Sequence, residues 1–144
     1  MHRLPLILAL IATPALAVED GHAFGLAGLL SRSNKHDLRP ITLSAGMPLA
    51  DTAWALRSGT YYEVEIQSDG SQELGLVGPG FFRAIWIDEI VIEGLEIRPL
   101  GLDSVEFDAA GVMEIGFVAI KPGRYHLKVP GTTGDTQRLE IEIK

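Results

Sequence analysis

The stretch "KPGRYHLKVPG", residues 121–131, indicates what kind of fold this chain adopts. Its Pro-Gly pair predicts a turn, and the "RYHLKV" that follows alternates between apolar and polar residues. With Tyr125 and Leu127 on one side and His126 on the other, this alternation is typical of a strand with one buried face. The segment therefore predicts a turn that leads into a half-buried strand, with His126 facing outward.

Similar units of turn and strand follow one another from Leu38 to the end of the chain. The first strand is expected around Pro40–Leu43, and "TYYEVEIQS", "QELGLV", "SVEFD", "VMEIGFVAI" and "RLEIEIK" supply further ones. "FFRAIWIDEIVI" fits either a helix start or a strand, and Glu93-Gly94 after it is typical of a hairpin turn. About seven to eight short strands, with a turn every eight to twelve residues or so, predict an all-β Greek-key β-sandwich.

The chain begins with "MHRLPLILALIATPALA", which has the features of a signal peptide. A short basic start precedes an apolar run, and Ala15-Leu16-Ala17 has the small-x-small pattern of a cleavage site. The apolar run of roughly 10–13 residues is too short to span a bilayer. We therefore predict a signal peptide at 1–17, a flexible lead-in at 18–37, a domain at 38–144, and a periplasmic location. An uncleaved amphipathic helix or anchor is the alternative for the first segment.

The composition narrows the classes of partner and activity. The chain has 12 Lys and Arg against 19 Asp and Glu, so a nucleic acid or an anionic membrane surface is not expected as a partner. No second long apolar stretch follows residue 17, so no membrane insertion is expected after cleavage. Nucleophile-elbow, phosphate-loop and dinucleotide motifs are absent from the sequence. On this basis the sequence predicts that the protein is not an enzyme.

Three motifs make the region from about Leu38 to Lys144 resemble the cupredoxins: "LSAGMPL", "SDGSQELGLVGPG" and "AIKPGRYHL". The resemblance implies a cupredoxin-like β-sandwich. However, this chain has Gln72-Glu73 where a cupredoxin has its first copper histidine, and it contains no cysteine. Val129 or a neighbour stands where the copper cysteine would be, and neither histidine nor methionine follows His126. A blue-copper centre needs a thiolate and two imidazoles, so none is expected here.

The chain is also similar to the cupredoxin-like components of bacterial periplasmic iron-uptake systems. In that subgroup carboxylates replace imidazole and bind iron or copper weakly. The resemblance implies that Glu73 takes the position of the first histidine. It also implies a periplasmic or inner-membrane protein partner, for example a metal permease system.

Acidic residues concentrate between Asp88 and Asp108. Carboxylate oxygens suit hard cations, so Asp103, Glu106 and Asp108 are candidate metal ligands in addition to Glu73 and His126. The alternative is a solvated strand face, on which acidic residues need no cation, and a His126 that is simply exposed. The bound ion would be iron or copper, held weakly, unless the protein binds no metal at all.

The run "GPGFFRAIW" supplies a second candidate site. Phe81, Phe82, Arg83 and Trp86 would form an exposed surface that docks a protein partner, and the alternative is that the aromatic side chains belong to the core.

Two functions follow from the sequence. The first is a periplasmic accessory protein that handles iron or copper in uptake or transfer; the other is a metal-free docking or scaffold module.

Overall fold

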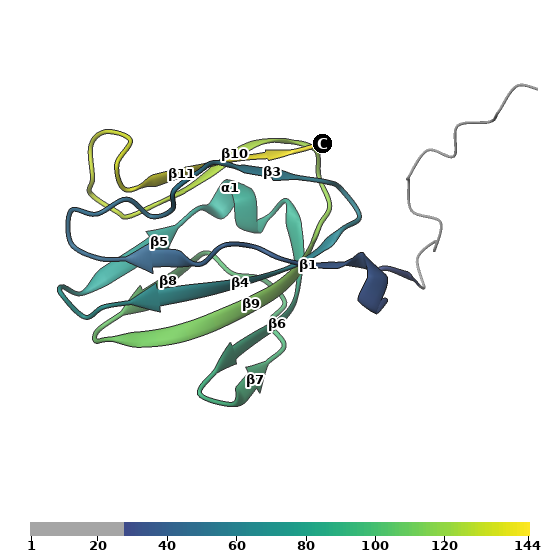
Figure 1. Cartoon of the computed structure of the whole chain (residues 1–144), viewed down its shortest axis with the longest axis horizontal. Coiled ribbons are helices and arrows are strands. Elements are labelled where there is room, and N and C mark those ends of the chain that lie inside the picture. Colours follow the sequence, from purple (N-terminus) through teal and green to yellow (C-terminus); the bar gives the residue numbers. More distant parts are fainter. Residues whose placement is uncertain (1–27) are drawn as a thin grey trace, which may run out of the picture.

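The computed structural model describes residues 28–144, which fold into two packed β-sheets (Figure 1). A 3-10 turn at Arg32–Asn34 precedes eleven strands and one short helix in this part of the chain. In chain order they are β1 (Lys35–Asp37), β2 (Ile41–Leu43), β3 (Trp54–Leu56), β4 (Tyr61–Ser68), β5 (Leu74–Val77), α1 (Pro79–Phe82), β6 (Ile85–Ile92), β7 (Leu95–Ile97), β8 (Ser104–Phe107), β9 (Gly111–Ala119), β10 (Gly123–Lys128) and β11 (Arg138–Ile143). The predicted all-β sandwich is confirmed. The predicted signal peptide at 1–17 lies outside the described residues.

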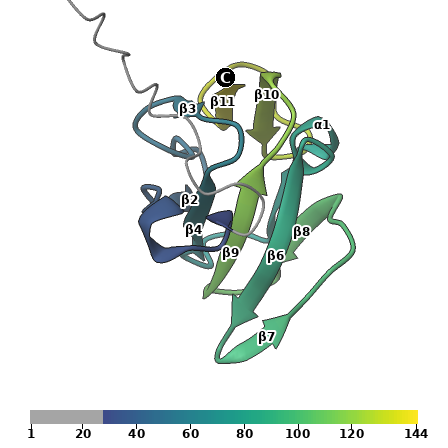
Figure 2. The same cartoon turned by 90° about the vertical axis from the view of Figure 1, so that its right-hand side faces the viewer.

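The first sheet has the strand order β1-β4-β9-β6-β7, with β2 also beside β4, and the second has the order β3-β11-β10-β5-β8. β4, β9 and β6 run antiparallel and form the long centre of the first sheet. In contrast, β1 and β2 join β4 in parallel, and β3 joins β11 in parallel. Parallel neighbours require crossover connections, so the chain passes between the two sheets more than once. In Figure 2 β10 and β11 lie above the long strands β4, β9 and β6 of the first sheet.

The core lies between the sheets and follows from the alternation of the sequence. Every second residue of β4 and β11 is buried there, namely Tyr62, Val64, Ile66, Leu139, Ile141 and Ile143. Aromatic rings gather around Phe81, whose ring centroid lies 5.6 Å from that of Phe117 and 6.3 Å from that of Trp54. In residues 28–144 no helix has the length and apolarity that a membrane crossing requires.

Two short strands were not expected from the sequence. β1 falls inside the predicted lead-in at 18–37 and pairs with the start of β4. The preceding turn is anchored by Asn34, whose side-chain amide donates to the carbonyl oxygens of Leu29 and Gly59, each at 2.9 Å. The ordered domain thus begins before Leu38, and the predicted lead-in is corrected over its last residues. β3 was also missed, because a three-residue strand is too short to show an alternation.

The ambiguous segment after Gly80 contains both a helix and a strand. Pro79 occupies the start of α1, where its fixed φ is favourable, and β6 begins at Ile85. The predicted turn at Glu93-Gly94 is confirmed, because the two residues have φ values of 49° and 81° and connect β6 to β7. Two consecutive positive φ values are those of a two-residue type I′ hairpin turn.

Candidate functional site

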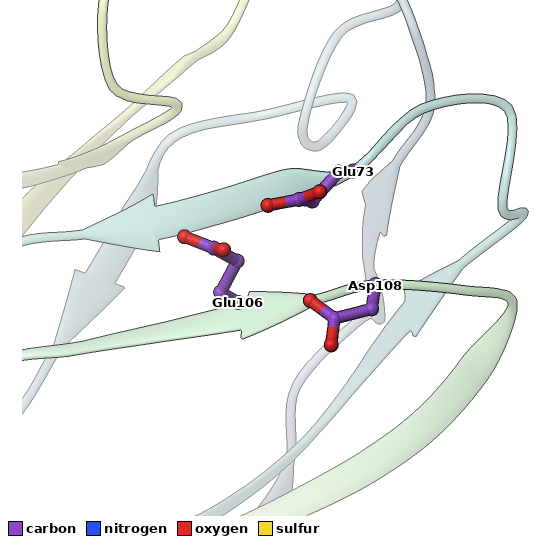
Figure 3. Close-up of side chains that lie close together, drawn as sticks. All are labelled: Glu73, Glu106 and Asp108. Atoms are coloured by element: carbon purple, nitrogen blue, oxygen red, sulfur yellow. The ribbon is translucent and has the colours of Figure 1, made fainter.

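Three of the predicted metal ligands lie together at one end of the second sheet. Glu73 directly precedes β5, while Glu106 belongs to β8 and Asp108 follows it. Since Leu74 pairs with Phe107 and both side chains point inward, the side chains before and after them point outward. Figure 3 shows the side chains of Glu73 and Glu106 extending toward each other across the two strands, with Asp108 beside Glu106. We call these three residues the carboxylate cluster.

A tight turn positions Glu73 in this cluster. Gly70 has a φ of 71°, and a Cβ at this residue would lie 2.7 Å from the backbone nitrogen of Ala110. Only glycine therefore allows the turn after β4 to approach the turn before β9 this closely. The side chain of Asp69 stabilises the same turn by accepting from the backbone N–H of Ser71 at 2.8 Å. Because Asp108 lies two residues before Ala110, this contact also brings Glu73 close to Asp108.

The geometry of the cluster is compatible with a bound cation. One ligand oxygen from each of the three carboxylates lies within 4.8 Å of the others, and all three residues are exposed. Two oxygens on opposite sides of an ion, each about 2.3 Å from it, are about 4.6 Å apart. An ion at the centre could therefore reach all three carboxylates with small side-chain movements.

The charges of the cluster act most strongly on Glu73. A hydrogen bond with Glu106 raises the pKa of Glu73 above its ordinary value, and the negative charges of Glu106 and Asp108 raise it further. Three carboxylates at this spacing repel one another in the ionised state. A shared proton relieves the repulsion, and so does a cation, so the two compete for the site.

The other two predicted ligands do not join the cluster. Asp103 lies near Arg83, with its carboxylate 4.0 Å from the guanidinium group. His126 faces outward from β10, opposite Glu140 of β11. Lys128 pairs with Val77, so the antiparallel register places His126 beyond the carboxyl end of β5, whereas Glu73 precedes its amino end. That separation is about 20 Å along the sheet at 3.3 Å per residue. The prediction that His126 and Asp103 share a site with Glu73 is therefore wrong.

A second acidic group, on the outer face of the first sheet, was not predicted as a group from the sequence. Arg98 binds Asp88 at 2.9 Å and Glu89 at 3.1 Å, and it also contacts Glu96. Burial raises the pKa of Glu89, and its hydrogen bond with Glu96 has the same effect. The acidic segment 88–108 therefore splits between the two sheets. The part around Arg98 already has a cationic partner. In contrast, no residue of the carboxylate cluster forms an ion pair with a basic side chain of residues 28–144.

The predicted docking surface is only partly exposed. Phe81 and Phe82 are buried in the core, since α1 turns both rings toward the space between the sheets. The prediction that they contact a partner is therefore wrong. Arg83 is exposed, and Trp86 retains 47% of its surface because it lies on the outer face of β6.

Comparison with known proteins places the fold. No protein family and no curated protein matches the sequence. Solved structures do match. A multi-copper oxidase from Pseudomonas thermotolerans is 14% identical, with a TM-score of 0.55 over 78% of this chain and 30% of that one. A laccase-like multi-copper oxidase from Ochrobactrum sp. is 7% identical, with a TM-score of 0.56 over 78% of this chain and 32% of that one. A copper nitrite reductase from Nitrosomonas europaea is 15% identical, with a TM-score of 0.50 over 66% of this chain and 33% of that one.

The fold is cupredoxin-like. The chain spans about a third of the length of these copper proteins, and at this identity the likeness concerns the fold alone.

The comparisons nevertheless contradict the prediction that the protein is not an enzyme, because the proteins that share the fold are an oxidase, a laccase-like oxidase and a nitrite reductase. An enzyme whose chemistry depends on a bound metal does not need a nucleophile motif or a dinucleotide motif. Their absence was therefore not a valid reason to exclude catalysis.

The side chains of this domain do not fit a type 1 copper centre. The chain has no cysteine to supply the thiolate. Val129, which stands near the expected cysteine position, is buried in the apolar core. Met113, whose thioether is of the kind that serves as a weak axial copper ligand, is buried there as well. His126 lies far from Glu73 on the outer face of β10. In contrast, the oxygen-only carboxylate cluster suits a cation bound at the surface.

Proposed function

We propose that this protein is an exported cupredoxin-like accessory protein that binds iron or copper through Glu73, Glu106 and Asp108. The observation that supports this function is the convergence of their ligand oxygens within 4.8 Å. The cupredoxin-like fold adds support, since the solved structures that share it are named as copper proteins. Export to the periplasm rests on the signal-peptide pattern at 1–17.

The chemistry of the cluster suits a carrier that exchanges its ion readily. Carboxylate oxygens bind hard cations such as iron, and any given set of ligands binds Cu²⁺ more tightly than the other divalent first-row metals. Because all three residues are exposed, solvent can complete the coordination and a partner can approach the ion. Exposed ligands also bind weakly, which is compatible with transfer.

Protons regulate this binding in a defined direction. Glu73 must lose its proton to coordinate an ion, and its raised pKa means that it keeps that proton to a higher pH than an ordinary glutamate. Metal affinity should thus fall as the pH drops through the pKa of Glu73. An acidic medium would favour release of the ion.

The test is titration calorimetry of the purified protein with Cu²⁺ and, under anaerobic conditions, Fe²⁺. Glu73→Gln removes one charged ligand and should raise the Kd at least about tenfold. Such a change corresponds to a loss of roughly 1.4 kcal/mol of binding free energy. Asp103→Asn is the matched control, because it removes an exposed carboxylate of the same acidic segment outside the cluster. Equal losses in both variants, or no binding below millimolar concentrations in the unaltered protein, would contradict the proposal.

For the protein partner, we propose a periplasmic or inner-membrane component of a metal permease system. With Phe81 and Phe82 in the core, Arg83 and Trp86 remain as candidates for the contact surface. Aromatic and arginine side chains are frequent contributors to binding energy at protein interfaces. Arg83→Ala should weaken binding to the purified permease component without lowering the Tm, and unchanged binding would remove Arg83 from the surface.

A further inference from the structure

β7 forms one edge of the first sheet, and its outer side is open. Within residues 28–144 it pairs only with β6, and Figures 1 and 2 show it at the rim of the molecule. A strand at an edge presents backbone N–H and C=O groups that another strand can bind. Pro99 follows Arg98 and limits this edge on one side, and the turn at Glu93-Gly94 limits it on the other.

The hairpin of β6 and β7 also exposes apolar side chains. Ile97 pairs with Ile90, whose side chain is in the core, so alternation places Leu95 and Ile97 on the inner face of the sheet. Nevertheless, Leu95 is 63% exposed, and Ile92 and Ile97 are each 39% exposed. The apolar inner face of the first sheet thus extends beyond the part that the second sheet covers.

The hairpin turn determines which backbone groups point to the open side. A two-residue turn is flanked by a hydrogen-bonded pair, here Ile92 and Leu95, and the pattern alternates from there. Leu95 and Ile97 therefore direct their N–H and C=O groups toward β6. Glu96 and Arg98 direct theirs toward the open edge.

We propose that β7 pairs with β7 of a second copy of this chain, antiparallel and centred on Ile97. In this register Glu96 of each copy lies opposite Arg98 of the other copy. Both residues have outward backbone groups, so each pair can form two backbone hydrogen bonds and one ion pair. The exposed Ile97 side chains of the two copies become neighbours on the apolar face.

The charges favour this register over its neighbours. A shift by two residues in one direction places Glu96 opposite Glu96 of the second copy. A shift in the other direction places Arg98 opposite Arg98, and like charges directly opposite each other are unfavourable. Arg98 already contacts Asp88, Glu89 and Glu96 of its own chain. In the dimer the two copies exchange their Glu96 carboxylates, so each guanidinium keeps three acidic partners for its five donors. The edge is therefore complementary to itself in one arrangement, which is the reason for choosing a second copy as the occupant.

This contact does not involve the carboxylate cluster, which belongs to the other sheet. Dimerisation and cation binding can accordingly succeed or fail separately. An edge contact of this size buries less surface than a permanent dimer does, so the association should depend on concentration.

The test is sedimentation equilibrium of the purified protein from about 5 to 500 µM, a range that suits a small interface. The weight-average mass should rise from that of one chain toward twice that value. Glu96→Arg makes both edge positions basic, and Arg98→Glu makes both acidic. Each variant alone should weaken association at least about tenfold, whereas an equimolar mixture should form a mixed dimer with affinity near that of the unaltered protein.

A third variant examines the backbone contribution. Glu96→Pro removes an outward N–H while leaving the pairing with β6 possible, because proline is tolerated where the N–H faces solvent. It should abolish association and retain the circular dichroism spectrum of the unaltered protein. The proposal is overturned if the unaltered protein stays monomeric up to the highest concentration, if Glu96→Pro dimerises normally, or if the mixture of the charge variants stays monomeric.

Discussion

The burial of Phe81 leads to a quantitative prediction, because the alternative was a surface role in docking. The side chain is 2% exposed, and its ring contacts four aromatic neighbours. The distances between ring centroids are 5.6 Å to Phe117, 5.9 Å to Phe82, 6.3 Å to Trp54 and 6.5 Å to Tyr125. Phe81 thus links α1 to both sheets, and removing its ring should leave a cavity in the middle of the core.

The expected cost of Phe81→Ala is about 3–5 kcal/mol of the free energy of unfolding, which combines lost apolar burial with the cavity left behind. Domains of this size are stable by only about 5–15 kcal/mol, so the variant should retain a reduced fraction of the total. At about 3–5 °C per kcal/mol for a domain of this length, Tm should fall by roughly 9–25 °C.

Urea unfolding followed by far-ultraviolet circular dichroism measures this loss. Leu100→Ala is the control, because Leu100 is fully exposed and its truncation should change stability by less than about 0.5 kcal/mol. If Phe81→Ala does not fold, Phe81→Leu should still fold and lose an intermediate amount, about 1–2 kcal/mol. An unfolding midpoint for Phe81→Ala equal to that of Leu100→Ala would refute the placement of Phe81 in the core.

Three further predictions concern close contacts, protonation and a turn. In Gly116→Ala the new Cβ would clash with the Oη atom of Tyr61. We therefore expect the free energy of unfolding, measured with urea, to fall by about 1–3 kcal/mol. Adding Tyr61→Phe removes the Oη atom and should recover part of this loss. No recovery would mean that the clash lies elsewhere. Glu106→Gln should lower the pKa of Glu73 toward its ordinary value, because it removes the hydrogen bond between the two carboxyl groups and a neighbouring negative charge. Carboxyl-carbon NMR titration measures this pKa, and an unchanged value would argue against the contact. Glu93→Asn should raise stability by about 0.5–1 kcal/mol, because Glu93 has a φ of 49° that asparagine adopts more readily; an equal or lower Tm would contradict it.

The sequence alone was sufficient to predict the long strands and several turns. Alternation in "TYYEVEIQS" and "RLEIEIK" specified which side chains are buried, because a strand exposes its two faces in turn. The turn at Glu93-Gly94 was predictable for a similar reason, since few residue pairs adopt two positive φ values. These features depend on residues that are neighbours in the chain.

The composition of the candidate site was decided by tertiary structure. Glu73 and Glu106 are 33 positions apart in the sequence and meet only because β5 pairs with β8 in one register. His126 is excluded for a related reason, because the pairing of β10 with β5 places it at the opposite end. A register shift of one residue would turn each carboxylate to the other face, and nothing in the local sequence specifies that alignment.

The sequence also could not decide between core and surface for the aromatic run. Phe81 and Phe82 are buried while Trp86 is half exposed, because α1 ends before β6 begins and the two elements present their side chains differently. Local propensity is ambiguous where a short helix joins a strand, so packing against Trp54 and Phe117 determines the outcome. Alternation thus determined the strands of this protein, whereas long-range strand pairing determined which carboxylates meet and which aromatic rings are buried.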